Sequence, residues 1–231
     1  GQGLAIDEEI PYGHRANERD IIVQYGVTEW RKLFSPRQLL VAQVFLESLL
    51  EIGKEISEAM ASDRATAVRT YLALSLDKCV DYNCISSTWE VTRQVVKHIF
   101  ARHSFATAWS FGEFDGAANL LPWGVSQISD AYKELANLSF PSQQSLLAIQ
   151  RQTKLNQLAV TCGSASALAS LPEGSVSNIT VDPPYYNNVQ YAELADYFYV
   201  WQKRSVGPLF PEFFSDELTN KDDEAVANPA R

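Results

Sequence analysis

The strongest constraint on the fold is a helix start signal at Ser35, which precedes a long stretch of periodic apolar residues. Ser35 is a favourable N-cap, Pro36 stands where a missing N–H costs nothing, and Gln38 completes a capping box. Apolar residues then recur at helical spacing, namely Leu39, Leu40, Val44, Leu46, Leu50 and Ile56. The stretch 29–60 therefore predicts a long amphipathic helix.

The same periodicity predicts further helices before residue 156. We expect them over 64–82, 91–102 and 125–138, with a short one after Pro141. The segment 111–124 is rich in Gly, Asn and Pro, which is typical of a loop. The apolar face of the helix over 125–138 is expected to point inward, and it comprises Val125, Ile128, Tyr132 and Leu135.

The character of the sequence changes near residue 157. The segments 157–162 and 176–181 have the composition of buried strands, and 189–204 has the pattern of an aromatic-rich amphipathic helix. The predicted fold class is therefore α/β, with a helix-rich N-terminal part and a partial Rossmann-like sheet. We predict an irregular lead-in over 1–27, a helical region over 28–155 and an α/β segment over 156–231.

Composition restricts the class of partner. The net charge is −9, from 28 acidic and 19 basic residues, so binding to DNA must depend on a local site rather than on overall charge. No apolar run is long enough for a membrane helix, and the N-terminus has no signal core. The three cysteines do not form a disulfide framework. A cytoplasmic protein without a membrane partner is predicted.

The segment that carries chemistry is Asp182-Pro183-Pro184-Tyr185, directly after the predicted strand 176–181. Ligands bind at the carboxyl ends of strands in open α/β sheets. The two prolines stiffen the loop, so the Asp182 carboxylate and the Pro183 carbonyl are presented as acceptors beside the aromatic ring of Tyr185. Two acceptors and a stacking surface suit a planar base with an exocyclic amine. Such a base must be flipped out of duplex DNA to be reached.

The motif resembles the signature of S-adenosylmethionine-dependent enzymes that methylate adenine N6 or cytosine N4. The longer run 181–204 is similar to bacterial and archaeal adenine-specific DNA methylases that also carry a zinc ribbon, as are 25–40 and 71–90. The resemblance implies DNA as the partner, adenine N6 as the preferred target, and a role in restriction or defence.

The resemblance also implies roles for individual residues. Asp182 and Pro183 would accept the target amine, and Tyr185 would stack on the base. Pro184 would complete the catalytic loop. Loop positions expected to contact the substrate are Tyr186, Asn188 and Tyr191. Positions expected to contact S-adenosylmethionine are Ser164 and Thr180.

The chain departs from the family pattern in several places. Asn187 and Ser164 stand where relatives usually have acidic residues. A Phe-x-Gly-x-Gly cofactor loop after a strand is missing, and Cys79 and Cys84 have no second cysteine pair, so no metal site is expected. Met60 is the only methionine. We therefore expect the C-terminal part of a methylase, inactive alone, whose cofactor loop lies in an N-terminal segment or a partner.

Two other functions remain open at this stage. The same loop geometry serves other planar amines, so the acceptor is RNA or a protein amide in one alternative. In the other, the chain is a non-catalytic helical interaction module that assembles with a cofactor-binding partner. The recognition sequence and the oligomeric state do not follow from the sequence.

Overall fold

The computed structural model describes residues 4–11, 22–101, 104–139, 168, 171–222 and 224–227. The chain divides into two compact units, of which the first comprises Gly1–Ser129 and Pro184–Arg231 and the second comprises Asp130–Pro183. The predicted domain boundary at 155/156 lies outside the described residues. None of the helices in the described part is long and apolar enough to cross a bilayer.

Helix α2 (Pro36–Ala59) begins where its capping box predicts. The Ser35 Oγ accepts a hydrogen bond from Gln38 N at 3.3 Å, and Gln38 Oε1 accepts one from Ser35 N at 2.9 Å. The preceding residues of the predicted stretch instead form a separate 3-10 helix, η1 (Trp30–Leu33). The start signal at Ser35 is therefore confirmed, while the helix itself is shorter than the stretch 29–60.

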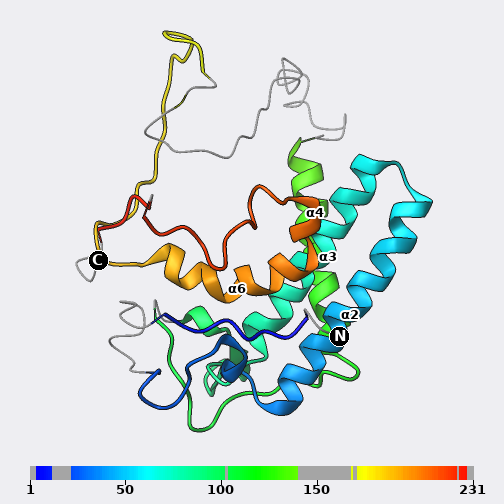
Figure 1. Cartoon of the computed structure of the whole chain (residues 1–231), viewed down its shortest axis with the longest axis vertical. Coiled ribbons are helices and arrows are strands. Elements are labelled where there is room, and N and C mark those ends of the chain that lie inside the picture. Colours follow the sequence, from blue (N-terminus) through cyan, green and yellow to red (C-terminus); the bar gives the residue numbers. More distant parts are fainter. Residues whose placement is uncertain are drawn as a thin grey trace. The chain divides into compact units, whose positions relative to one another are not determined.

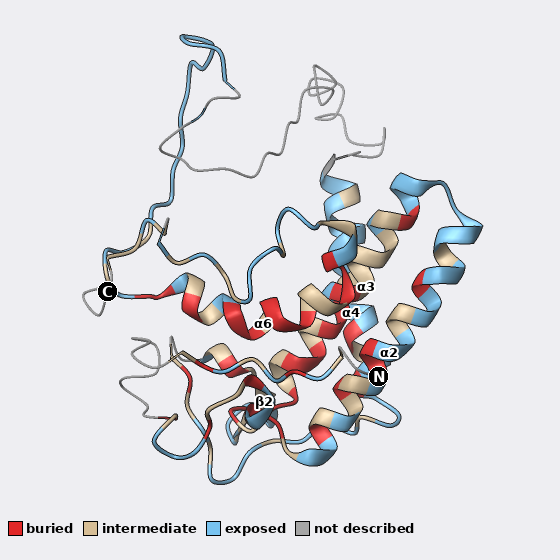
Figure 2. Ribbon diagram, in the orientation of Figure 1, coloured by how far each residue is buried: buried red, intermediate tan, exposed pale blue. Residues whose placement is uncertain are grey.

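Helix α3 (Ser62–Tyr82) confirms the helix predicted over 64–82 and pairs with α2 in an antiparallel hairpin (Figure 1). Helix α6 (Tyr191–Ser205), predicted over 189–204, packs against both. Its buried side is aromatic: Tyr197 stacks on Phe34 at 5.7 Å between ring centroids and donates a hydrogen bond to Val80 O at 2.7 Å. Figure 2 shows buried residues along much of α6.

The helix predicted over 91–102 is wrong. Strands β1 (Thr88–Glu90) and β2 (Val95–Lys97) pair there as an antiparallel hairpin, followed by the 3-10 helix η2 (Ile99–Ala101). The β-branched residues in this segment lose side-chain freedom in a helix and favour strands. Gln94 has a φ of 53°, which suits a turn and interrupts a helix. Helical spacing of the apolar residues was therefore a misleading signal.

Helix α4 (Leu120–Ser139) confirms the helix predicted over 125–138 but begins earlier. Its expected inward face is wrong, because Val125 and Leu135 are exposed and Ile128 is only half-buried. Gly124 instead faces α3, so closely that a Cβ there would lie 2.6 Å from Cys79 Sγ. In unit 1 this helix thus packs through a glycine, which a pattern of hydrophobic residues does not reveal.

The expected sheet differs most from the structure. The segment 176–181 is exposed and irregular, so the strand predicted there is wrong, and 157–162 lies outside the described residues. Within the described ranges the sheet consists of β1 and β2 alone. A strand is stable only beside a partner strand, and 176–181 pairs with none among the described residues. The described protein is helix-rich with a small antiparallel sheet, which agrees with α/β only at a coarse level.

The irregular lead-in contributes to the core of unit 1. Ile6, Ile10 and Ile22 are buried in the same apolar cluster as Trp30. Ile10 N also donates a hydrogen bond to Thr28 O at 2.9 Å. The described residues of this segment therefore contribute to the core of unit 1.

Candidate functional site

The Asp182-Pro183-Pro184-Tyr185 motif lies where the chain passes from one unit to the other. Asp182 and Pro183 end unit 2, and Pro184 begins the second segment of unit 1. The side chain of Asp182 and the ring of Pro183 are exposed. Among the described residues, no hydrogen bond engages the Asp182 carboxylate or the Pro183 carbonyl. Both predicted acceptors are thus accessible to a ligand.

The loop that follows is held by its own backbone. The Pro184 carbonyl accepts a hydrogen bond from Tyr186 N at 3.0 Å, and the Tyr185 carbonyl accepts one from Asn188 N at 2.9 Å. Tyr186 has a φ of 50°, in the left-handed region that non-glycine residues seldom adopt. Such outliers persist where surrounding contacts fix them, and they occur often at binding sites.

Three tyrosines of this segment face solvent. Tyr185 is 65% exposed, Tyr186 76% and Tyr191 48%. Asn188 is also exposed, whereas the next two residues, Val189 and Gln190, are buried. The loop is therefore anchored at Val189 and Gln190 and presents aromatic rings outward. An exposed ring on an anchored loop can stack on a base.

The C-terminal segment fixes this loop and the start of α6, which the sequence did not predict. Ala227 N donates a hydrogen bond to Tyr186 O at 3.0 Å, and Ala192 N donates one to Glu224 Oε1 at 2.9 Å. Glu224 therefore occupies the N-terminus of α6, where a carboxylate is favourable. Through this hydrogen bond the acidic C-terminal segment is attached to the helix.

A buried ion pair strengthens the same attachment. Lys221 Nζ lies 2.8 Å from Asp196 Oδ2, and Asp196 is fully buried on α6. Thr219 donates hydrogen bonds from both its N and its Oγ1 to Asp196 Oδ1, at 2.9 and 2.6 Å. A sequence signal for the burial of Asp196 was its position next to Tyr197, on the apolar side of the predicted helix.

The structure describes only one of the two residues expected to contact S-adenosylmethionine. Ser164 lies outside the described residues, and Thr180 is exposed in the irregular segment 176–181. The described residues include no pair of parallel strands, so contact with this cofactor stays a prediction.

The cysteines have the properties of buried structural residues. Burial raises the pKa of the Cys79 thiol to about 12 and that of the Cys84 thiol to about 11. Both prefer the neutral form, which is a poor nucleophile and metal ligand. Within the described ranges, no group of three or more His, Cys, Asp or Glu side chains could hold a metal ion. Cys162 and His103 lie outside these ranges.

A second group of ionisable residues, also missed by the sequence analysis, lies on α3. Burial raises the pKa of Asp77 to about 7, although a hydrogen bond from Gln202 Nε2 acts in the opposite direction. Burial likewise raises the pKa of Asp81, which lies 3.5 Å from His98 Nδ1. These acids join α3 to α6 and to the segment after β2.

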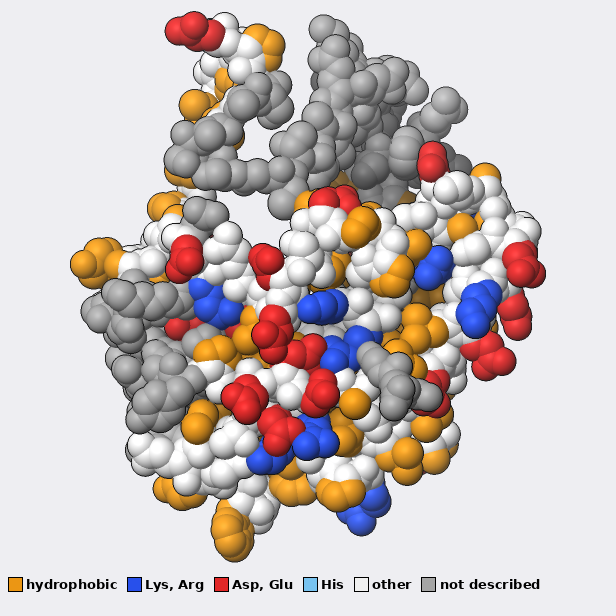
Figure 3. Space-filling model, in the orientation of Figure 1, with side chains coloured by type: hydrophobic (Ala, Val, Ile, Leu, Met, Phe, Trp, Pro, Cys, Tyr) orange, Lys and Arg blue, Asp and Glu red, His pale blue; other side chains and the backbone are white. Residues whose placement is uncertain are grey.

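Basic side chains on the face drawn in Figure 3 are interspersed with acidic ones. Elsewhere among the described residues, two arginines are paired with acids: Arg204 Nη1 lies 2.7 Å from Glu8 Oε1, and Arg37 Nη2 lies 2.7 Å from Glu113 Oε2. A continuous basic stripe for nucleic-acid phosphates is not visible on this face.

The chain matches no protein-family model, no curated protein and no solved structure. Its function is therefore inferred from its own residues.

Proposed function

We propose that this chain supplies the target-amine loop of an S-adenosylmethionine-dependent DNA methyltransferase, with adenine N6 as the preferred acceptor and cytosine N4 as the alternative. The observation that carries the proposal is the motif at 182–185. Two accessible acceptors, on Asp182 and Pro183, precede the exposed ring of Tyr185 on a loop whose following residues are fixed. This combination suits a flipped base better than a structural turn, because a structural turn leaves no reason for the exposed tyrosines.

The chemistry required of these residues is modest. S-adenosylmethionine supplies the methyl group. The Asp182 carboxylate and the Pro183 carbonyl accept the two amine hydrogens and so orient the nitrogen lone pair, while Tyr185 holds the ring by stacking. The nearby oxygens would stabilise the positive charge that the nitrogen acquires with the methyl group until a proton leaves to solvent, and S-adenosylhomocysteine would be released. A covalent enzyme intermediate is not needed, which fits the neutral buried thiols.

Binding of the cofactor is assigned to another part of the assembly. The described residues lack the glycine-rich turn and the strand ends that hold it, so we propose that a further segment or a partner protein carries them. The partial Rossmann-like sheet belongs to this proposal, with its parallel strands supplied by that segment or partner. A cytoplasmic location and a role in restriction or defence follow from the same proposal.

The direct test is methyl transfer to DNA by the assembly that contains this chain, compared between Asp182→Ala and Glu173→Ala. Both acids are exposed, but only Asp182 belongs to the proposed loop. We expect Asp182→Ala to abolish transfer and Glu173→Ala to retain it. Near-normal transfer by Asp182→Ala removes the loop from the reaction. RNA and protein substrates assayed in parallel identify the alternative acceptors.

A second candidate is an interaction module without catalytic activity, which the exposed face of α4 favours. Val125, Leu135 and Leu138 are exposed aliphatic residues on that helix. Such a face is typical of helices that bind a partner. Calorimetry with S-adenosylmethionine tests whether this chain alone binds the cofactor. We expect weak or no binding. Micromolar affinity contradicts the assignment of the cofactor to another segment.

A further inference from the structure

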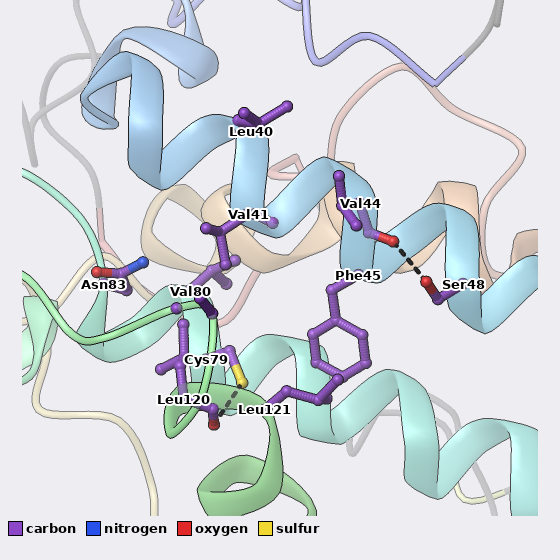
Figure 4. Close-up of a pocket in the computed structure, with 13 residues that line it drawn as sticks. Leu40, Val41, Val44, Phe45, Ser48, Cys79, Val80, Asn83, Leu120 and Leu121 are labelled. Carbon is purple, nitrogen blue, oxygen red and sulfur yellow. Dashed lines mark hydrogen bonds between the residues drawn. The ribbon is translucent and has the colours of Figure 1, made fainter.

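A cavity of about 360 Å³ lies in unit 1 between α2, α3 and the start of α4. Figure 4 shows its walls, which are mostly aliphatic and aromatic. The side chains that enclose it most closely are Val41, Val44, Phe45, Val80, Leu120 and Leu121. The cavity shares no residue with the loop at 182–191 and is independent of the proposed function.

Two of the polar groups in the wall are already satisfied within the protein. The Ser48 hydroxyl donates a hydrogen bond to Val44 O at 2.9 Å. The Cys79 thiol donates one to Leu120 O at 3.5 Å. These groups offer little to a ligand, so the cavity selects for apolar molecules.

Asn83 is the exception. This buried residue at the end of α3 accepts hydrogen bonds through Oδ1 from Phe114 N at 3.1 Å and from Gln38 Nε2 at 3.5 Å. A backbone N–H can only donate, so the atom of the Asn83 amide that lies nearest to Phe114 N must be the oxygen, Oδ1. The contact with Gln38 gives the same assignment. Gln38 Oε1 already accepts a hydrogen bond in the capping box, so Gln38 Nε2 is the atom that donates to Asn83.

The other end of the Asn83 amide is therefore turned away from Phe114. Its nitrogen points toward the cavity in Figure 4. Among the described residues, no hydrogen bond uses Asn83 Nδ2. A donor in an otherwise apolar cavity is the kind of polar group that orients a ligand in a small-molecule site.

We propose that this cavity binds a small, largely apolar molecule that carries one hydrogen-bond acceptor, which receives a hydrogen bond from Asn83 Nδ2. The volume supports this, because a dry apolar cavity of about 150 Å³ already accommodates benzene. Access is provided at the rim, where Val44 is 51% exposed. A ligand seated there removes both the cavity surface and the rim side chains from water.

The test uses two probes of nearly equal shape, acetophenone and α-methylstyrene, titrated into the ¹⁵N-labelled chain and followed by NMR. Acetophenone has a carbonyl acceptor where α-methylstyrene has a CH₂ group. We expect both to shift signals of residues that line the cavity, with acetophenone binding about fivefold more tightly because of a single added hydrogen bond. Equal affinity for the two probes overturns the role of Asn83.

Two matched variants locate the binding. Val44→Phe extends a rim side chain over the cavity, and Ile52→Phe makes the same type of change at an exposed position of α2 outside it. We expect Val44→Phe to weaken both probes at least tenfold and Ile52→Phe to leave them unchanged. Unaltered binding to Val44→Phe, or no binding by the unmodified chain, overturns the proposal.

Asn83→Asp completes the set, because it retains the acceptor for Phe114 but removes the donor. We expect it to abolish the preference for acetophenone. A folded Asn83→Asp variant that keeps the preference contradicts the assignment of the donor. If the variant does not fold, the comparison of the two probes and Val44→Phe still decides the proposal.

Discussion

Replacement of Asp77 by Asn tests the electrostatics of the α3–α6 junction. Asp77 is half-buried as a residue, but its Oδ1 atom is buried and has no hydrogen-bond partner among the described residues. Its Oδ2 accepts a hydrogen bond from Gln202 Nε2 on α6. The pKa of Asp77 is raised from 3.8 to about 7, and burial is the largest cause. The hydrogen bond from Gln202 lowers the pKa, whereas the neighbouring charge of Asp81 raises it further.

The sign and size of the effect on stability follow from this shift. An unfolded chain releases the Asp77 proton near pH 3.8, whereas the folded chain holds it to about pH 7. The folded state binds more protons between these values, so this residue makes the protein less stable as pH rises through that window. The slope is about 1.4 kcal/mol per pH unit, and the total is at most about 4 kcal/mol.

The assay is urea unfolding at pH values between 4 and 8, followed by the fluorescence of the buried Trp30 and Trp201. Asp77→Asn retains the shape of the side chain and removes the proton. We expect its stability to fall less steeply with pH and to exceed that of the unmodified chain at pH 8. Asp63→Asn, an exposed acid on the same helix, serves as the control. Equal slopes for Asp77→Asn and the unmodified chain refute the reasoning.

The remaining predictions concern stability and are all measured by urea unfolding. Ser35→Ala removes the N-cap of α2 and is expected to cost about 1 kcal/mol, and no loss contradicts the capping box as a stabilising contact. Gly124→Ala places a Cβ 2.6 Å from Cys79 Sγ and is expected to cost about 1–3 kcal/mol; a neutral change means that α4 packs less closely than described. Lys221→Met leaves the buried Asp196 without its cation and is expected to cost about 3 kcal/mol, and an unchanged midpoint contradicts the attachment of the C-terminal segment.

Local signals account for the parts of the fold that the sequence predicted. The capping box at Ser35 marks the start of α2 because its bonds join residues three positions apart. The helices α3 and α6 follow from apolar periodicity over many turns. Tyr197 and Trp201 are buried on α6, in the segment 189–204 that was predicted as an aromatic-rich amphipathic helix.

The failures have a common physical origin in contacts between distant residues. Strand pairing decides the structure of 88–97, and a helical pattern in the same residues does not reveal it. The packed face of α4 depends on the approach of Gly124 to α3. The ion pair between Lys221 and Asp196 joins residues whose proximity the sequence does not encode in any short motif.

The candidate site shows the same division. The candidate residues of the loop were identified from a short motif and its flanks. The structure leaves Asp182, Pro183, Tyr185, Tyr186, Asn188 and Tyr191 exposed, while Pro184 is half-buried. The attachment of this loop by Ala227 and Glu224 was not identified, because it depends on the return of the C-terminal segment.

The central claim is tested most directly by identifying the methylated nucleoside. DNA is incubated with S-adenosylmethionine carrying a labelled methyl group and with the assembly that contains this chain, then digested and analysed by mass spectrometry. The proposal predicts label in N6-methyladenine, with N4-methylcytosine as the alternative product. Unlabelled DNA, with the label found in RNA or protein instead or nowhere, contradicts it.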